Sequence, residues 1–231
     1  MTQIGINYRT VDETVAEAAE RSGRRREDIR LVTVTKFVDT ERIKEAVDAG
    51  ACEVGENRAQ ELVDKYEFFR ENSQKVHFIG QLQLNKIKYL IGRADLIQSA
   101  DRMEAFLEID RLANKHGVIQ DALMEINIGD EPQKGGIDVP NAPELLKRIS
   151  DMPNVRVKGL MCIPPAADTR GAEYFFKRMK ELFEDIRALN IPNISMEILS
   201  MGMSHDYPEA IASGANMVRV GSAIFGARPR H

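Results

Sequence analysis

The feature that most constrains the fold is the alternation, along the whole chain, of short apolar runs with longer segments rich in charged residues. Strands that alternate with helices form a parallel sheet with crossover helices. The predicted strands are Leu31–Lys36, Ala51–Val54, Val76–Ile79, Asp95–Gln98, Ala122–Ile128, Val155–Cys162, Ser195–Leu199 and Met217–Val220. About eight such units close a (β/α)8 barrel, so we predict a single α/β TIM barrel.

Two capping-box spacings mark the predicted starts of helices. Thr10 with Glu13, and Asp101 with Glu104, place a hydrogen-bond acceptor three residues before an acid. This arrangement satisfies the free N–H groups at a helix N-terminus. We therefore predict an extra helix over about residues 9–22, before the first strand, and another that begins near residue 102. No low-complexity linker interrupts the chain, so residues 1–231 are predicted to form one domain.

The charge pattern excludes several classes of partner. The formal net charge is −4, with acids and bases interspersed, so no positive field is available to attract nucleic acid. No apolar run approaches membrane-spanning length, and the N-terminal segment lacks the features of a secretory signal. We therefore expect a cytoplasmic protein. Cys52 and Cys162 lie in separate apolar runs, and we expect both to be buried, reduced thiols.

Lys36 ends the first predicted strand. If its side chain points into the mouth of the barrel, Val34 and Val32 also point inward, because side chains alternate along a strand. Leu31 and Thr33 then face the helices. Partial desolvation of the amine raises its neutral, nucleophilic fraction, which can condense with an aldehyde. The alternative is a lysine that extends from a strand end into solvent.

The loops after the last two predicted strands combine glycine with serine. They are Ser200-Met-Gly-Met-Ser204 and Gly221-Ser-Ala-Ile-Phe-Gly226. In (β/α)8 barrels, a phosphate is frequently bound by the loops after strands seven and eight and by the N-terminus of a short extra helix. Glycine lets the backbone approach the anion, and serine hydroxyls donate to it. Together with Lys36, these loops predict a site for a phosphorylated aldehyde.

Two further polar residues each have two interpretations. Arg219 lies on the last predicted strand, two residues before Gly221, so we expect its side chain inside the barrel below the phosphate loop. The alternative is a salt bridge to an interior carboxylate such as Glu125. Asn57 follows the second strand and either hydrogen-bonds a ligand or caps the next helix.

A series of short motifs carries a resemblance to a known family. The motifs are Thr35-Lys36, Val54-Gly-Glu-Asn57, Gln60-Glu61, His77-Phe-Ile-Gly80, Asn85-Lys86, Lys134-Gly-Gly136, Gly159-Leu-Met161, Ser200-Met-Gly-Met-Ser204 and Val218-Arg-Val-Gly-Ser-Ala-Ile-Phe-Gly226. In this order they resemble the pyridoxal phosphate homeostasis protein family. Its members are small barrels that bind pyridoxal 5'-phosphate (PLP) and are similar to the N-terminal domain of alanine racemase. Phe37, Gln81 and Leu84 depart from the family pattern, which leaves open whether the loop before Asn85-Lys86 meets a partner.

The resemblance implies a role for each matched residue. Lys36 is expected to form a Schiff base with PLP, and Arg219 to face the pyridine nitrogen. A guanidinium there opposes protonation of the ring and weakens it as an electron sink. The phosphate is expected to be held by Ser200, Ser204, Gly221 and Ser222, and the ring pocket to be lined by Asn57 and Met161.

The resemblance also implies a protein of intracellular PLP homeostasis with little or no catalytic turnover. A racemase needs a second acid/base on the other face of the cofactor, and Tyr207 is the single tyrosine near a predicted site loop. We therefore predict no catalytic residue, with a PLP-dependent amino-acid racemase as the alternative. A Schiff-base aldolase that acts on a phosphosugar is a third hypothesis.

The sequence and the resemblance together define the expected partners. The chain contains four histidines without paired metal spacing, so no metal is expected. The predicted ligand is PLP. Apo-enzymes that require PLP are an open alternative as recipients, and the chain is expected to be a monomer.

Overall fold

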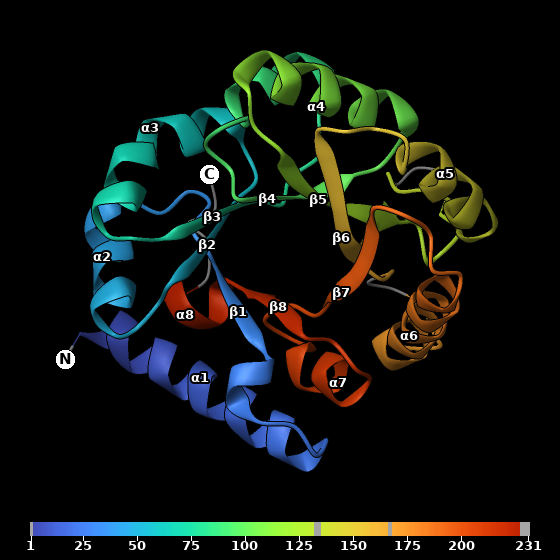
Figure 1. Ribbon diagram of the computed structural model, residues 1–231. Coiled ribbons are helices and arrows are strands. Elements are labelled where there is room, and N and C mark those ends of the chain that lie inside the picture. Colours follow the sequence, from blue (N-terminus) through green and yellow to red (C-terminus); the bar gives the residue numbers. More distant parts are fainter. Residues whose placement is uncertain (1, 132–134, 166–167, 227–231) are drawn as a thin grey trace.

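The computed structural model of the 231-residue chain describes residues 2–131, 135–165 and 168–226, in which eight parallel strands close a barrel in chain order (Figure 1). The strands are β1 (Arg30–Val34), β2 (Glu53–Glu56), β3 (Lys75–Phe78), β4 (Leu96–Ala100), β5 (Gln120–Ile126), β6 (Val155–Cys162), β7 (Ile194–Ser200) and β8 (Met217–Val220). β1 pairs with both β2 and β8, which closes the ring. The predicted (β/α)8 TIM barrel is confirmed.

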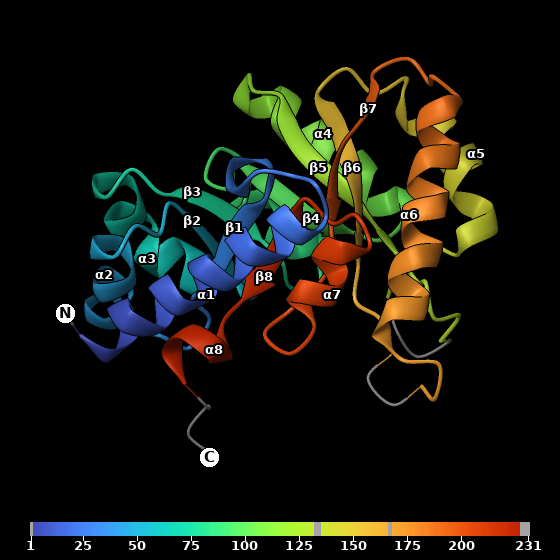
Figure 2. The same ribbon diagram turned by 90° about the horizontal axis from the view of Figure 1, so that it is seen from below.

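Helices surround the ring of strands (Figure 1). They are α1 (Gln3–Arg21), α2 (Thr40–Asp48), α3 (Ala59–Glu71), α4 (Met103–His116), α5 (Ala142–Ile149), α6 (Ala172–Ala188), α7 (Tyr207–Ala212) and α8 (Ser222–Phe225), with the short 3-10 helices η1 (Arg26–Asp28), η2 (Leu84–Tyr89) and η3 (Val139–Asn141). α8 lies at the lower edge of the molecule in Figure 2 and packs against α1. None of the helices within these described ranges is long and apolar enough to cross a membrane.

The side-chain alternation predicted for β1 is present. Val32 packs inside the ring with side chains from β4, β5, β6, β7 and β8, namely Leu96, Leu123, Met161, Ile198 and Met217. Leu31 belongs instead to the larger cluster between the strands and the helices. The strand ends at Val34, two residues earlier than predicted. The left-handed conformation of Phe37, with a φ of 62°, turns the chain just after Lys36.

The start of α1 differs from the capping-box prediction. The helix begins at Gln3, because the Thr2 hydroxyl accepts a hydrogen bond from the Gly5 N–H at 3.2 Å. Thr10 lies within α1, where its hydroxyl donates to the Ile6 carbonyl at 3.2 Å. The spacing of a capping box also occurs inside helices, so it placed the start about two turns too late.

The second capping box correctly predicted a helix that begins near residue 102, but not how its first turn is capped. α4 begins at Met103, its N-cap is Arg102, and no described side chain caps it. The Asp101 carboxylate pairs with Arg102 instead of accepting from the backbone of the first turn. A neighbouring guanidinium competes with the helix N–H groups for the same carboxylate.

The two cysteines differ in exposure. Cys162 is buried as predicted, and burial raises the pKa of its thiol to about 12. Cys52 is exposed, so the prediction that both are buried was wrong. Cys52 comes one residue before β2, in the turn that enters the amino-terminal end of the barrel, where an apolar run need not be covered.

Candidate functional site

A cavity of about 250 Å³ opens at the carboxyl ends of the strands. Its wall is built from segments that follow β1, β3, β6, β7 and β8, so the closed barrel brings together residues far apart in the sequence. Five predicted site residues line this cavity, namely Lys36, Ser204, Arg219, Gly221 and Ser222. The carboxyl end is where (β/α)8 barrels place their functional sites.

Lys36 is half-buried in the turn just beyond β1. Two side chains of α3 hold this turn. The backbone N–H of Phe37 donates to Glu61 Oε2 at 2.7 Å, and the Lys65 ammonium donates to the Thr35 carbonyl at 3.0 Å. The residues on both sides of Lys36 are therefore tied to one helix, which fixes the backbone from which its side chain enters the cavity.

A buried group of charges stands behind this turn. Lys65 Nζ lies 2.8 Å from Glu56 Oε1 and 3.0 Å from Glu61 Oε2, and the Thr35 hydroxyl donates to Glu56 Oε1 at 2.7 Å. Burial raises the pKa of Glu56, and Lys65 opposes that rise. No role was predicted from the sequence for these residues. The spacing of Glu61 and Lys65 indicates an ion pair within one helix, but only the fold shows that the pair meets the turn of Lys36.

The turn that opens α8 directs two backbone N–H groups at one oxygen. Gly221 and Ala223 donate to the Ser204 hydroxyl at 3.2 and 3.4 Å. Ser204 belongs to the loop after β7, so the two predicted phosphate loops are joined directly. Backbone N–H groups that converge on one oxygen have the geometry of an anion-binding nest.

Two outer helices anchor the other end of α8. Asn7 of α1 donates from Nδ2 to the Ile224 carbonyl at 2.9 Å, and Arg42 of α2 donates from Nη2 to the Phe225 carbonyl at 2.6 Å. These bonds satisfy the last carbonyls of a short helix, which have no partner inside it. The position of the turn therefore depends on α1 and α2, a role that no local motif reveals.

Arg219 is buried inside the barrel, with 4% of its surface exposed. Its Nη1 donates to Ser200 Oγ at 2.6 Å, and its Nη2 donates to the Cys162 carbonyl at 3.0 Å. Burial lowers the pKa of Arg219, but a guanidinium starts so high that it remains a cation. The charge is therefore held rigidly at the wall of the cavity.

Glu125 is not the partner of Arg219, so the salt-bridge alternative was wrong. The guanidinium uses Ser200 and the backbone of Cys162 instead. Glu125 is half-buried on β5. Burial raises its pKa to about 7, the nearby Asp101 adds to the rise, and Arg219 opposes it. A carboxyl group that titrates near neutrality therefore belongs to the barrel interior.

Ser200 and Met161 are buried in the barrel interior, below the cavity. Ser200 is fully buried, and its hydroxyl donates to Gln98 Oε1 at 2.7 Å while it accepts from Arg219. Met161 is fully buried in the interior cluster. Neither residue lines the cavity. Ser200 therefore supports Arg219, and its contact with a phosphate stays a prediction; Met161 contributes to the packed floor.

Asn57 does not cap α3, because Arg58 is the N-cap of that helix. The side chain is half-buried, and its Oδ1 is buried without a hydrogen-bond partner among the described residues. Asn57 does not line the 250 Å³ cavity itself. Lys134, in the quoted Lys134-Gly-Gly136 motif, lies outside the described residues. Within the described part of the chain, no group of three or more His, Cys, Asp or Glu side chains is arranged to hold a metal ion.

Comparisons with known proteins agree with this geometry. Residues 6–229 match the family model of the alanine racemase N-terminal domain. The chain is 41% identical over 217 residues to a pyridoxal phosphate homeostasis protein of Aquifex aeolicus (strain VF5), covering 94% of each chain.

Two solved structures show the likeness of the fold. The structure of PipY from Synechococcus elongatus PCC7942 with PLP bound has a TM-score of 0.81 and 29% identity, over 92% of this chain and 100% of that one. Alanine racemase from Streptomyces coelicolor A3(2) has a TM-score of 0.73 and 18% identity, over 98% of this chain and 58% of that one. At that identity the likeness to the racemase concerns the fold alone.

Proposed function

This chain belongs to the pyridoxal phosphate homeostasis protein family, and from that premise we propose that it binds PLP as a reversible Schiff base on Lys36. The protein holds the cofactor for intracellular PLP homeostasis, with little or no turnover. The proposed location is the cytoplasm. PLP-requiring apo-enzymes are the proposed recipients, and the proposed oligomeric state is a monomer.

One observation carries the proposal. Lys36, the cationic Arg219 and the turn of Gly221 and Ser222 line the same cavity. An aldehyde needs an amine, a phosphate needs N–H and hydroxyl donors, and a pyridine ring needs a wall that sets the charge at its nitrogen. The donor set at the cavity therefore fits PLP, and a relative with the same fold binds it.

Each residue of the proposed site has a separate role. Lys36 supplies the amine, with its turn tied down by Glu61 and Lys65. Gly221, Ser222 and Ser204 hold the phosphate. When bound, PLP supplies an electron-withdrawing ring, and the guanidinium of Arg219 weakens that property by opposing protonation of the ring nitrogen.

The proposal also includes the predicted contacts of Asn57 and Met161 with the ring. Asn57 has no hydrogen-bond partner for its Oδ1 among the described residues, and we assign this atom to the edge of the ring site. Met161 forms the floor beneath the ring as part of the interior cluster. Ser200 is assigned a supporting role through its bond to Arg219, with the phosphate contact kept as a prediction.

The chemistry of the cavity favours a carrier over a racemase. Tyr207 is buried at the start of α7 and does not line the cavity. A racemase needs a second proton-transfer group opposite the lysine, and the weakened ring lowers the gain from proton abstraction. Release of stored PLP needs only reversal of its condensation with Lys36, which water or a recipient amine accomplishes.

Absorption spectroscopy with an amino-acid assay tests this function. The wild-type protein loaded with PLP is expected to be yellow, and Lys36→Ala is expected to lose the absorption band. Negligible racemisation of D- and L-amino acids is expected. Racemisation at ordinary enzymatic rates would establish the racemase instead, and a wild-type protein that stays colourless at saturating PLP would favour the phosphosugar aldolase.

A further inference from the structure

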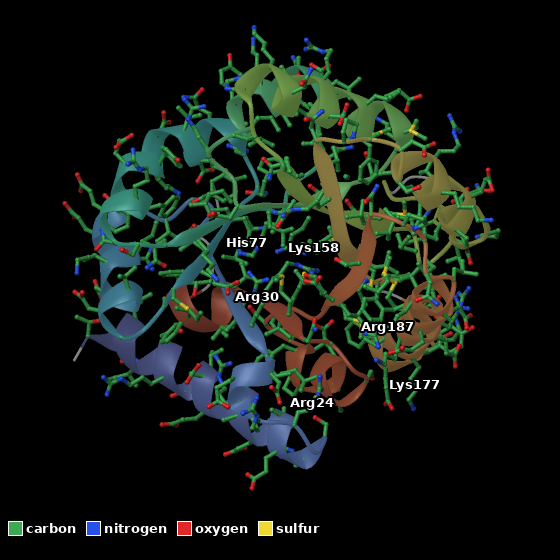
Figure 3. The ribbon with its side chains drawn as sticks, in the orientation of Figure 1. Arg24, Arg30, His77, Lys158, Lys177 and Arg187 are labelled. Atoms are coloured by element: carbon green, nitrogen blue, oxygen red, sulfur yellow. The ribbon has the colours of Figure 1, made fainter. Side chains whose placement is uncertain are left out.

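A line of buried polar side chains runs through the interior of the barrel, from the cavity to its opposite end. Each member comes from a different strand: Arg219 from β8, Ser200 from β7, Gln98 from β4, His77 from β3, Glu53 from β2 and Arg30 from β1. Glu53 and Arg30 are the first residues of their strands, so they lie at the amino-terminal end of the barrel. Figure 3 shows the side chains of Arg30 and His77 inside the ring of strands.

The upper half of this line is a continuous series of hydrogen bonds. Arg219 Nη1 donates to Ser200 Oγ at 2.6 Å, and Ser200 Oγ donates to Gln98 Oε1 at 2.7 Å. The amide nitrogen of Gln98 lies 2.8 Å from His77 Nδ1. An amide nitrogen is only a donor, so His77 Nδ1 accepts and the imidazole carries its proton on Nε2.

The lower half ends on a carboxylate. His77 Nε2 lies 3.2 Å from Glu53 Oε2, within ion-pair distance but outside the alignment of a hydrogen bond. Arg30 Nε donates to Glu53 Oε1 at 2.9 Å from the other side. The hydrogen bonds that link Arg219, Ser200, Gln98 and His77 therefore all run in one direction, toward the end of the barrel where Glu53 lies.

The direction of these hydrogen bonds affects the charges at both ends because the side chains are buried. Ser200, Gln98 and His77 are fully buried, and Glu53 is 7% exposed. In such surroundings an unpaired polar group is costly, and aligned hydrogen bonds polarise one another. Burial opposes ionisation of Glu53, but His77 and Arg30 outweigh it and hold its pKa at about 2. The line thus leads from the cationic Arg219 to the Glu53 carboxylate, which Arg30 pairs from the other side.

We propose that Gln98 is a positioning residue for Arg219, and that the Glu53 carboxylate acts on the cofactor site through His77, Gln98 and Ser200. Among the described residues, no carboxylate contacts the Arg219 guanidinium; Ser200 and the Cys162 carbonyl hold it. The orientation of its charge toward the cavity depends on the direction of the Ser200 hydroxyl. Gln98 sets that direction, because its Oε1 accepts the serine proton while its Nε2 donates to His77 Nδ1 and to Met217 Sδ.

This inference rests on the proposed function at one point, the contact of Arg219 with the pyridine ring of PLP. The test therefore has an arm without cofactor. The Nε–H resonance of Arg219 is recorded in ¹⁵N-labelled protein and assigned by its absence from Arg219→Lys. Gln98→Leu removes both polar links of the line, so this resonance is expected to shift. Ser99→Ala is the matched control, because Ser99 is the next residue on β4 and donates to the Gly80 carbonyl at 2.5 Å, outside the line.

The second arm uses the protein loaded with PLP. Gln98→Leu is expected to shift the absorption band and to raise the Kd for PLP by about tenfold, the equivalent of one weakened hydrogen bond to a charged group. Ser99→Ala is expected to leave both unchanged. Glu53→Gln is the variant to use if Gln98→Leu does not fold. Its side chain lies at the far end of the barrel, and it is expected to move the same band in the same direction by a smaller amount.

The measurements without and with PLP distinguish a failure of this inference from a failure of the proposed function. An unchanged Arg219 resonance and an unchanged band in a folded Gln98→Leu or Glu53→Gln protein would overturn the inference. A shifted resonance in a protein whose wild type never binds PLP would overturn the proposed function and leave the positioning of Arg219 standing. Equal shifts in Ser99→Ala would mean that any lost bond in β4 has this effect, which also contradicts the role of Gln98.

Discussion

Gly221 and Ser204 are joined by a hydrogen bond of 3.2 Å, in which the backbone N–H of the glycine donates to the serine hydroxyl. The two residues belong to the loops after β8 and β7. The bond joins the two loops into one surface, although the two residues are 17 positions apart in the sequence. It also places the serine oxygen against two backbone N–H groups of the turn proposed to hold the phosphate.

A negative charge in this turn is predicted to weaken PLP binding. Ser222 is exposed at the start of α8 and lines the cavity. In Ser222→Asp the new carboxylate repels the phosphate, and the Kd is expected to rise by at least about tenfold. Ser150→Asp, after α5, adds the same charge at the other end of the barrel as a control. Equal affinities of Ser222→Asp and the wild type in a spectrophotometric titration would remove Ser222 from the site.

The charge of Arg219 is predicted to determine the spectrum of the bound cofactor. In Arg219→Gln the amide keeps a donor for Ser200 but removes the cation, so the ring nitrogen protonates more readily and the absorption band moves. Arg219→Glu is expected to move the band further, because a carboxylate favours the protonated ring. Circular dichroism checks that both variants fold. Identical bands in the wild type and both variants would show that Arg219 does not face the ring.

The barrel is predicted to lose stability as Glu125 ionises. Burial, reinforced by Asp101, raises its pKa from 4.5 to about 7 in the folded protein. Between these values the folded protein holds a proton that the unfolded chain has lost, so this group lowers the free energy of unfolding as pH rises toward 7. Glu125→Gln removes the effect.

Urea denaturation across this pH range checks the sign. The stability of Glu125→Gln relative to the wild type is expected to increase from about pH 5 to about pH 8. Glu104→Gln, an exposed position on α4, serves as the control. A constant difference between Glu125→Gln and the wild type across the range would mean that Glu125 titrates normally.

A glycine in β6 is predicted to be indispensable for closing the barrel. Gly159 has a φ of 148°, and a Cβ there would lie 1.9 Å from the Ile198 carbonyl oxygen on β7. Gly159→Ala is expected to lower the free energy of unfolding by more than about 3 kcal/mol, because two paired strands must separate. Gly117→Ala meets no atom within 4 Å and tests the cost of a positive φ alone, expected at about 1 kcal/mol. Similar losses in the two variants would refute the steric explanation.

The sequence predicted the order and approximate position of all the strands because each is a short apolar run between helices. It could not place their ends. Lys36 was assigned to the first strand, but the left-handed turn at Phe37 ends β1 at Val34. The start of α1 at Gln3 depends on the hydroxyl of Thr2, which is not part of the capping-box spacing of Thr10 and Glu13.

Part of the candidate site could likewise be predicted from the sequence, and part could not. Lys36, Arg219 and the α8 turn could be found because they lie at strand ends, where the fold alone brings them together. The phosphate contact of Ser200 stays a prediction, and its hydrogen bonds to Gln98 and Arg219 could not be predicted from the sequence. Two other contacts join segments that are far apart in the sequence: Lys65 contacts Thr35, and Asn7 contacts α8. They could not be predicted, because a lysine or an asparagine is equally common on helices that make no such contact.

Borohydride reduction of the PLP-loaded protein, followed by peptide mass mapping, tests most directly whether Lys36 captures the cofactor. Reduction makes the bond between the lysine and the pyridoxyl group permanent. The account predicts one modified peptide, the one that contains Lys36, and no modification in Lys36→Ala. A pyridoxyl group on another lysine, such as Lys65, with Lys36 unmodified would contradict it.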